Sequence, residues 1–119
     1  MPAEKRTTGK LLPDSMLIFE WDEVNIAHIA RHGVETNEAE QVILNRPVDL
    51  NSELRNGEER FPHIGETNLG RILVVVTTMV GEKVRVVTAW PAGKKSRRWL
   101  LSLKRNGDVG RTETNDLRK

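Results

Sequence analysis

Apolar residues recur at helical spacing in two stretches of the N-terminal half. The first stretch follows a short β-prone run at residues 16–19 and predicts a helix from Glu23 to His32. Asp22 precedes this helix as a good N-cap, and Gly33 follows it where a left-handed residue commonly ends a helix. The apolar stripe that we expect to face the core consists of Ile26, Ile29 and Ala30.

A second helix is expected to begin at Thr36, whose side chain can cap it, and to end before Pro47. Glu38 lies in its first turn, where the helix dipole favours a negative charge. Its apolar positions at i, i+3 and i+4 are Ala39, Val42 and Ile43. The pattern therefore predicts two short, consecutive helices.

The next segments are interrupted by proline, glycine and polar residues. We expect a brief strand at residues 48–50 and a loop at residues 51–57. Residues 59–64 are expected to form an edge strand or a break in the sheet, because Pro62 has no N–H to donate to a ladder.

The strongest strand signal is the nearly continuous aliphatic and β-branched run at residues 71–80, which predicts a central strand buried on both faces. A tight turn at Gly81 and Glu82 leads into a partner strand at residues 83–90.

A C-terminal helix is expected at residues 94–105, with Trp99, Leu100 and Leu103 facing inward. Together these elements predict an α+β fold in which two N-terminal helices and a C-terminal helix pack on one face of an antiparallel β-sheet. We expect one domain at residues 16–105, preceded by a flexible segment at residues 1–15 and followed by a polar tail at residues 106–119.

Composition limits the classes of function. The 119 residues include no cysteine, which excludes a disulfide framework and a thiolate nucleophile or metal ligand. No segment approaches the roughly 20 apolar residues of a membrane span, and residues 1–15 contain no apolar stretch of signal-peptide length. We therefore expect a cytoplasmic protein without a membrane partner.

Charge is distributed unevenly along the chain. Residues 94–119 contain nine Lys or Arg and three Asp or Glu, a net charge of +6, which leaves −4 for the remainder because the total is +2. This segregation predicts a basic surface that attracts phosphate. The alternative interpretation is a basic face that only keeps the protein in solution.

Two sequence blocks point to a family. The first reads Phe19-Glu20-Trp21-Asp22 and continues with His28-Ile29-Ala30-Arg31-His32-Gly33-Val34, and the second reads Gly57-Glu58-Glu59-Arg60-Phe61. These blocks and the order of elements resemble BrnT-type proteins, small toxins of the RelE-like ribonuclease group of bacterial toxin–antitoxin pairs. The resemblance implies a RelE-like fold, a metal-independent endoribonuclease activity on RNA, no cofactor, and a cognate antitoxin in a hetero-oligomer.

Cleavage of RNA without a metal requires a base, an acid and cations around the phosphate. Our catalytic candidates are Glu59, Arg60, His63, Arg71 and Arg85. Our candidates for binding RNA phosphates are Lys94, Lys95, Arg97 and Arg98. We expect Arg60, Arg71, Arg85 and Lys94 to converge in one electropositive hollow. For Glu58 and Glu59, a solvated ladder of charges across strands is the alternative.

His28 and His32 are one helical turn apart and face the same direction. They are candidates for acid–base catalysis, or for a structural role in which the imidazoles bond Asp22, Glu20 or a carbonyl. A zinc site completed by His63 is a remote third interpretation, because the His-Glu-x-x-His pattern is absent. We assign no metal ligand.

The chain departs from the family pattern near the start of the last helix. Trp90, Gly93 and Ser96 stand where BrnT-type relatives usually carry an arginine, a Ser or Thr, and a glutamate. The alternative function is therefore a catalytically eroded RNA- or protein-binding module of the same fold. We expect Trp90 to be buried; if it were exposed, it could stack on a base.

Overall fold

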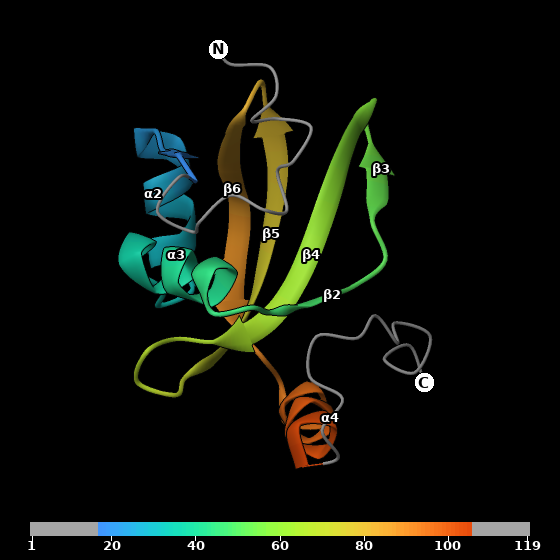
Figure 1. The fold of residues 1–119 in the computed structure, drawn as a ribbon. Helices are drawn as coiled ribbons and strands as arrows, with labels where there is room; N and C mark the ends of the chain where they lie inside the picture. Colours follow the sequence, from blue (N-terminus) through green and yellow to red (C-terminus); the bar gives the residue numbers. More distant parts are fainter. Residues whose placement is uncertain (1–16, 106–119) are drawn as a thin grey trace.

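The computed structural model describes residues 17–105, so the segment expected at residues 1–15 and the tail expected at residues 106–119 lie outside the described residues. The elements, in chain order, are β1 (Phe19–Glu20), α2 (Glu23–Ala30), α3 (Thr36–Leu44), β2 (Val48–Asp49), β3 (Glu53–Arg55), β4 (Glu58–Glu66), β5 (Ile72–Val80), β6 (Lys83–Pro91) and α4 (Lys94–Arg105). The α+β class expected from the sequence is confirmed, and Figure 1 shows its arrangement.

The strands form one sheet in the order β1-β6-β5-β4-β2, and β3 pairs with part of β4. The aliphatic run is the central strand β5, and its residues 72–78 are all buried, as expected. The expected antiparallel sheet is wrong in one respect, because β1 pairs with β6 in parallel and places Phe19 opposite Val84. The sheet is therefore mixed.

Helices cover both faces of the sheet. Alternate residues of β5 point to opposite sides, so Leu73 and Val75 pack under α2 and α3, while Val74 and Val76 join the cluster that contains Leu100 of α4. Figure 1 shows α2 and α3 beside the sheet and α4 at the lower end of the strands. The expectation of all helices on one face is wrong, because a central strand that is apolar on both faces must be covered on both.

For the middle of the chain, the loop expected at residues 51–57 and the edge position expected for residues 59–64 are wrong. The expected loop contains β3, which forms a hairpin with β4 through Asn56 and Gly57, both at positive φ (51° and 79°). Strand β4 is not at an edge, because β5 lies along one side and β2 and β3 share the other. The alternative expectation, a break in the ladder at Pro62, is confirmed on this side of β4: Pro62 lies between the stretches paired with β3 and with β2. Its carbonyl accepts a hydrogen bond from Leu50 N at 2.9 Å.

The N-terminal helices are capped by acidic residues. Asp22 accepts a hydrogen bond from Asn25 N at 2.8 Å, as expected, and α2 ends at Ala30, two residues earlier than expected. Helix α3 is capped by Glu35 instead of Thr36, and Glu38 completes a capping box by accepting from Glu35 N at 3.0 Å.

The apolar stripe of α2 is only partly as expected. Ile29 is fully buried, whereas Ile26 and Ala30 are exposed. The helix has barely two turns and buries one side chain, Ile29, in the apolar core, where Val34 after the turn joins it.

No helix within residues 17–105 combines the length and the apolar character needed to cross a membrane.

Candidate functional site

A groove of about 500 Å³ lies on the α4 side of the sheet, between the β3–β4 hairpin and the start of α4. Its walls combine apolar residues of the sheet with polar and charged residues at the rim. Its lining residues include Arg55, Arg60, Val74, Val76, Trp90 and Ser96. Its volume lies in the range of small-ligand sites.

Arg60 is the candidate catalytic residue that lines this groove. Its Nε donates to Glu58 Oε1 at 3.0 Å, and its side chain is 27% exposed. Guanidinium groups carry five N–H donors, and within residues 17–105 the two Nη nitrogens of Arg60 have no hydrogen-bond acceptor. These nitrogens can therefore bind an anion in the groove.

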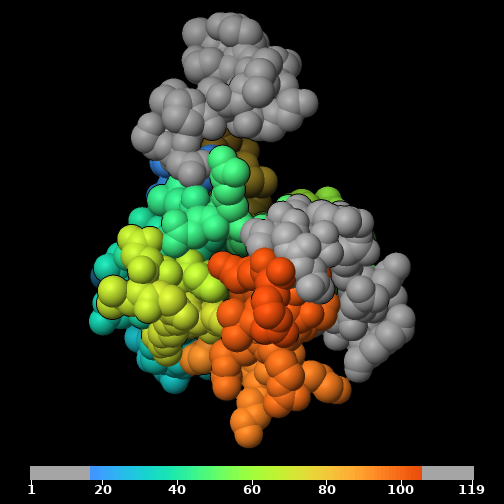
Figure 2. Space-filling model, turned by 60° about the horizontal axis from the view of Figure 1, so that its bottom comes forward, coloured from blue at the N-terminus to red at the C-terminus, as the bar shows by residue number. Residues whose placement is uncertain are grey.

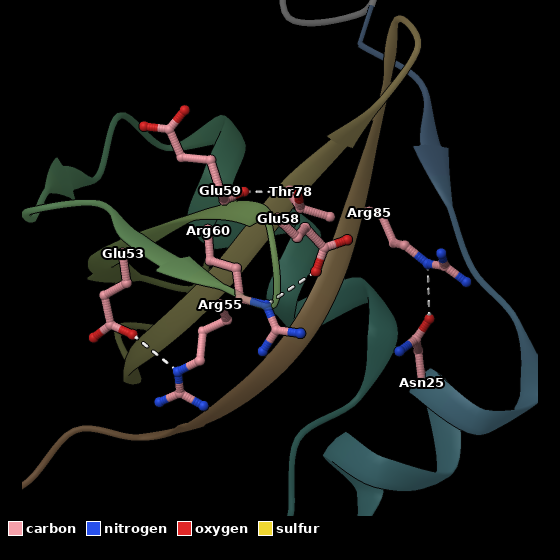
Figure 3. A network of polar contacts seen from close by, with 8 residues as sticks. All are labelled: Asn25, Glu53, Arg55, Glu58, Glu59, Arg60, Thr78 and Arg85. Carbon is pink, nitrogen blue, oxygen red and sulfur yellow. Dashed lines mark hydrogen bonds and ion pairs between the residues drawn. The ribbon is translucent and has the colours of Figure 1, made fainter.

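The β3–β4 hairpin brings a second arginine to the groove. Arg55 pairs with Glu58 across the hairpin, and its Nε lies 3.5 Å from Glu53 Oε1. Figure 3 shows the Arg55 and Arg60 side chains next to each other, each with its carboxylate, while Glu59 points the other way. Arg55 was not among the residues expected from the sequence, although Asn56-Gly57 is a strong hairpin signal that would have placed it beside β4.

Arg85 holds α2 against the sheet. Its Nη2 lies 2.6 Å from Asp22 Oδ2, and Figure 3 shows its side chain turned toward Asn25. The backbone N–H of Asn25 and the Arg85 guanidinium lower the pKa of Asp22, and the hydrogen bond with Asp22 raises the pKa of Arg85. This pair fixes the N-terminus of α2 beside β6.

Arg71 lies at the other end of the sheet. Arg85 pairs with Thr78, whereas Arg71 precedes β5, so the two positions are separated by roughly 23 Å of extended chain. Arg71 Nη1 donates to Glu38 Oε1 of α3 at 2.8 Å. The expected convergence of Arg60, Arg71, Arg85 and Lys94 in one positive hollow therefore does not occur, because each strand arginine is bound to a carboxylate and Arg71 is remote.

His63 belongs to a chain of polar contacts across three strands. Its Nδ1 lies 2.7 Å from Asp49 Oδ1, and its Nε2 lies 2.9 Å from Thr77 Oγ1. The order carboxylate–imidazole–hydroxyl is that of a hydrolase triad, but Thr77 is only 5% exposed, so a substrate cannot reach its hydroxyl. Pro62 lines the groove, and successive side chains of a strand point to opposite faces. The side chain of His63 therefore points away from the groove, to the other face of the sheet.

The basic run lies in the first turns of α4. Its four cations are exposed, and Arg97 Nη1 donates to Ala92 O at 2.8 Å, which ties the helix to the end of β6. Lys94 and Arg98 form no ion pair within residues 17–105. They lie opposite the buried Leu100 and so face solvent, beside the groove and not on its floor. Figure 2 shows α4, in orange, beside the turn that follows β4.

The two helix histidines contact each other away from this groove. The rings of His28, on α2, and His32, in the turn that follows α2, are in edge contact with a centroid distance of 5.3 Å, and α2 covers the opposite face of the sheet. Within residues 17–105 no group of three or more His, Asp or Glu side chains is arranged to hold a metal ion.

Trp90 is 38% exposed and lines the groove, so the expectation that it is buried is wrong. Ala89 packs under α2 and α3, and the next residue of β6 must therefore face the α4 side. Helix α4 buries Leu100 and Leu103 against that side and packs Trp99 there partly buried, but it leaves Trp90 partly uncovered. Ser96, at the start of α4, lines the same groove.

Comparison with known proteins agrees with the family suggested by the sequence blocks. The family model for "Ribonuclease toxin, BrnT, of type II toxin-antitoxin system" matches residues 21–96, more than half of the chain. The structure is similar to the crystal structure of the Brucella abortus ribonuclease toxin BrnT, with 23% sequence identity over 66% of this chain and 96% of that chain and a TM-score of 0.45. No curated protein sequence matches significantly. Because the family match spans α2 through the start of α4, the chain belongs to the BrnT family of ribonuclease toxins of type II toxin–antitoxin systems.

Proposed function

We propose that this protein is the toxin of a type II pair and a metal-independent endoribonuclease that cleaves RNA in the groove between the β3–β4 hairpin and α4. The observation that carries this proposal is Arg60, whose Nη nitrogens are available in a concave site of ligand size. Membership of the family supports the reaction. The proposal includes a RelE-like fold, a cytoplasmic location and a cognate antitoxin that covers the basic face of α4 in a hetero-oligomer.

The reaction that fits these residues is attack of the RNA 2′-hydroxyl on the adjacent phosphorus. The P–O5′ bond breaks, and the products are a 2′,3′-cyclic phosphate and a 5′-hydroxyl that takes its proton from water. Arg60 stabilises the negative charge that develops on the phosphate. Glu58, which is bound to Arg60, accepts the proton of the 2′-hydroxyl.

The test compares two ion-paired arginines. Arg60→Gln should reduce the rate of RNA cleavage by about 10²- to 10³-fold, the effect of removing one donor to a developing oxyanion. Arg71→Gln removes the same charge from a pair with Glu38 outside the groove, and it should leave the rate unchanged. The measurement is cleavage of a mixed-sequence RNA in excess EDTA, with the 3′ ends of the products identified by mass spectrometry.

Equal losses in the two variants would place the active site elsewhere. Cleavage that EDTA abolishes would contradict the metal-independent reaction.

A second function, binding of RNA without cleavage, is favoured by two observations. Trp90, Gly93 and Ser96 replace polar groups that the resemblance implies for relatives, and both arginines of the groove are already paired with carboxylates. RNA that is bound but yields no cyclic phosphate ends at any protein concentration would identify this binding module.

A further inference from the structure

The groove combines a partly exposed indole with an arginine. Trp90 is the eighth residue of β6 and pairs with Val74 of β5, so it is held on a rigid strand. Val74 and Val76 line the same groove and form an apolar surface beside the indole. Arg60, on β4, lines the groove from the other side of β5.

This combination fits a nucleotide whose base is not paired. A flat aromatic side chain contributes stacking energy with any base, because every base has a π face. A base within a duplex is stacked on its neighbours and cannot offer that face to the protein. Arg60 lies farther along the same groove, because Trp90 is level with Ile64 of β4, and its guanidinium can bind a phosphate of the strand whose base stacks on Trp90.

The polar rim is consistent with the same ligand. Ser96 and Thr88 present hydroxyl groups to the groove, and a hydroxyl can donate to or accept from the edge of a base. The first turn of α4 contains no acidic residue, and the carboxylate of Glu53, which lines the groove, lies 3.5 Å from Arg55 Nε. The groove also lies on a face that the α2 and α3 helices do not cover.

We propose that the groove binds an unpaired nucleobase stacked on Trp90, and that the protein therefore acts on single-stranded segments of RNA. This inference rests on the proposed RNA-directed function and adds the structural class of the substrate and a residue that selects it.

The experiment measures binding of oligonucleotides that cannot be cleaved. A single-stranded 2′-O-methyl RNA of mixed sequence lacks the attacking hydroxyl, and the same strand annealed to its complement provides the duplex. The single strand should bind at least tenfold more tightly than the duplex. Trp90→Leu should weaken binding of the single strand by about 5- to 150-fold, the range for loss of one stacked base.

Two controls separate stacking from folding. Trp90→Phe retains a flat ring and should restore most of the affinity, and the thermal unfolding midpoints of both variants should match that of the wild type. An exposed apolar residue outside the groove, Met79, provides Met79→Leu as a variant with no expected effect.

Single-strand affinity that Trp90→Leu leaves unchanged, or equal affinity for duplex and single strand, would overturn the inference. If cleavage of RNA by the wild type persists in that case, the proposed function stands without it. A wild type that neither binds nor cleaves RNA would overturn both.

Discussion

At the scale of single residues, carboxylates decide what each arginine does. Asp22 and Glu38 bind Arg85 and Arg71 at 2.6 and 2.8 Å, and these pairs join helices to the sheet. Arg60 is bound by a residue of its own strand, Glu58, and this pair fixes no second element. Arginines of similar appearance in the sequence therefore serve different purposes.

The Asp22–Arg85 pair predicts a specific response to acid. The pKa of Asp22 is lowered in the folded protein, so its contribution to stability is complete above its unfolded pKa and is lost as the pH falls through its folded pKa. Asp22→Asn should therefore lower the unfolding midpoint at pH 7, and the difference from the wild type should shrink below about pH 4. The measurement is thermal unfolding between pH 2.5 and 7.

Glu23→Gln is the matched control for this prediction. It removes an exposed acid from the same turn of α2 without breaking an ion pair described in residues 17–105, and it should change the midpoint little at any pH. If the unfolding midpoints of Asp22→Asn and the wild type differed by the same amount at every pH, the charge of Asp22 would contribute nothing. The cap would then act only as a neutral hydrogen-bond acceptor.

Sequence reasoning identified Asp22 as a cap because a cap depends on residues within three positions of each other. It could not identify Arg85 as the partner, which is 63 residues away. It placed Arg60 among the site candidates but omitted Arg55, because it read residues 51–57 as a loop. The candidate site was therefore predicted only where its chemistry depended on neighbours in the chain.

At the scale of elements, β4 is the strand on which the most other elements depend. It pairs with β2, β3 and β5, and its C-terminal end passes closely beneath the connection from α3 to β2. A Cβ atom at Gly65 would lie 3.0 Å from Pro47 Cβ and 3.1 Å from Pro47 Cα. Glycine is required here because the neighbouring backbone approaches, and not because of an unusual φ.

Gly65→Ala should destabilise the protein by about 1 to 3 kcal/mol, the usual cost of added volume in a packed site. Gly93→Ala is the control, because no neighbouring atom lies within 4 Å of the position that a Cβ atom of residue 93 would take. The free energy of unfolding of this variant should stay within about 0.5 kcal/mol of the wild-type value. Urea unfolding followed by circular dichroism measures both. If Gly65→Ala were as stable as Gly93→Ala, the segment around Pro47 would have to move aside at little cost in free energy.

At the scale of the whole molecule, the basic surface is separate from the paired arginines. The net charge of +6 over residues 94–119 belongs in part to the solvent face of α4, next to the groove. Positive charge beside a binding site attracts RNA over a range set by the ionic strength. Lys94 and Arg98 are expected to act in this way.

Lys94→Ala combined with Arg98→Ala should weaken RNA binding and flatten its dependence on salt by up to about 1.4 in slope, the value for two contacts with a single strand. Arg31→Ala combined with Lys83→Ala removes the same charge from exposed positions elsewhere and should leave the slope unchanged. Titrations at several salt concentrations measure the slopes. The same slope in both double variants would mean that only net charge matters.

The sequence alone determined the features that depend on local spacing. The central strand, the turn at Gly81, the cap at Asp22 and the helix at residues 94–105 all follow from hydrophobic period, backbone freedom or capping within a few residues. The family also followed from short blocks of sequence. These signals require no knowledge of distant contacts.

Only the tertiary structure decided which residues share a site. Three features depend on strand register and on the side to which α4 returns: the parallel pairing of β1 with β6, the cover of both sheet faces, and the exposure of Trp90 in the groove that Arg60 also lines. A shift of one residue in register would turn each side chain to the other face. Contacts between residues far apart in the chain set that register, so the chemistry of the groove was decided by folding.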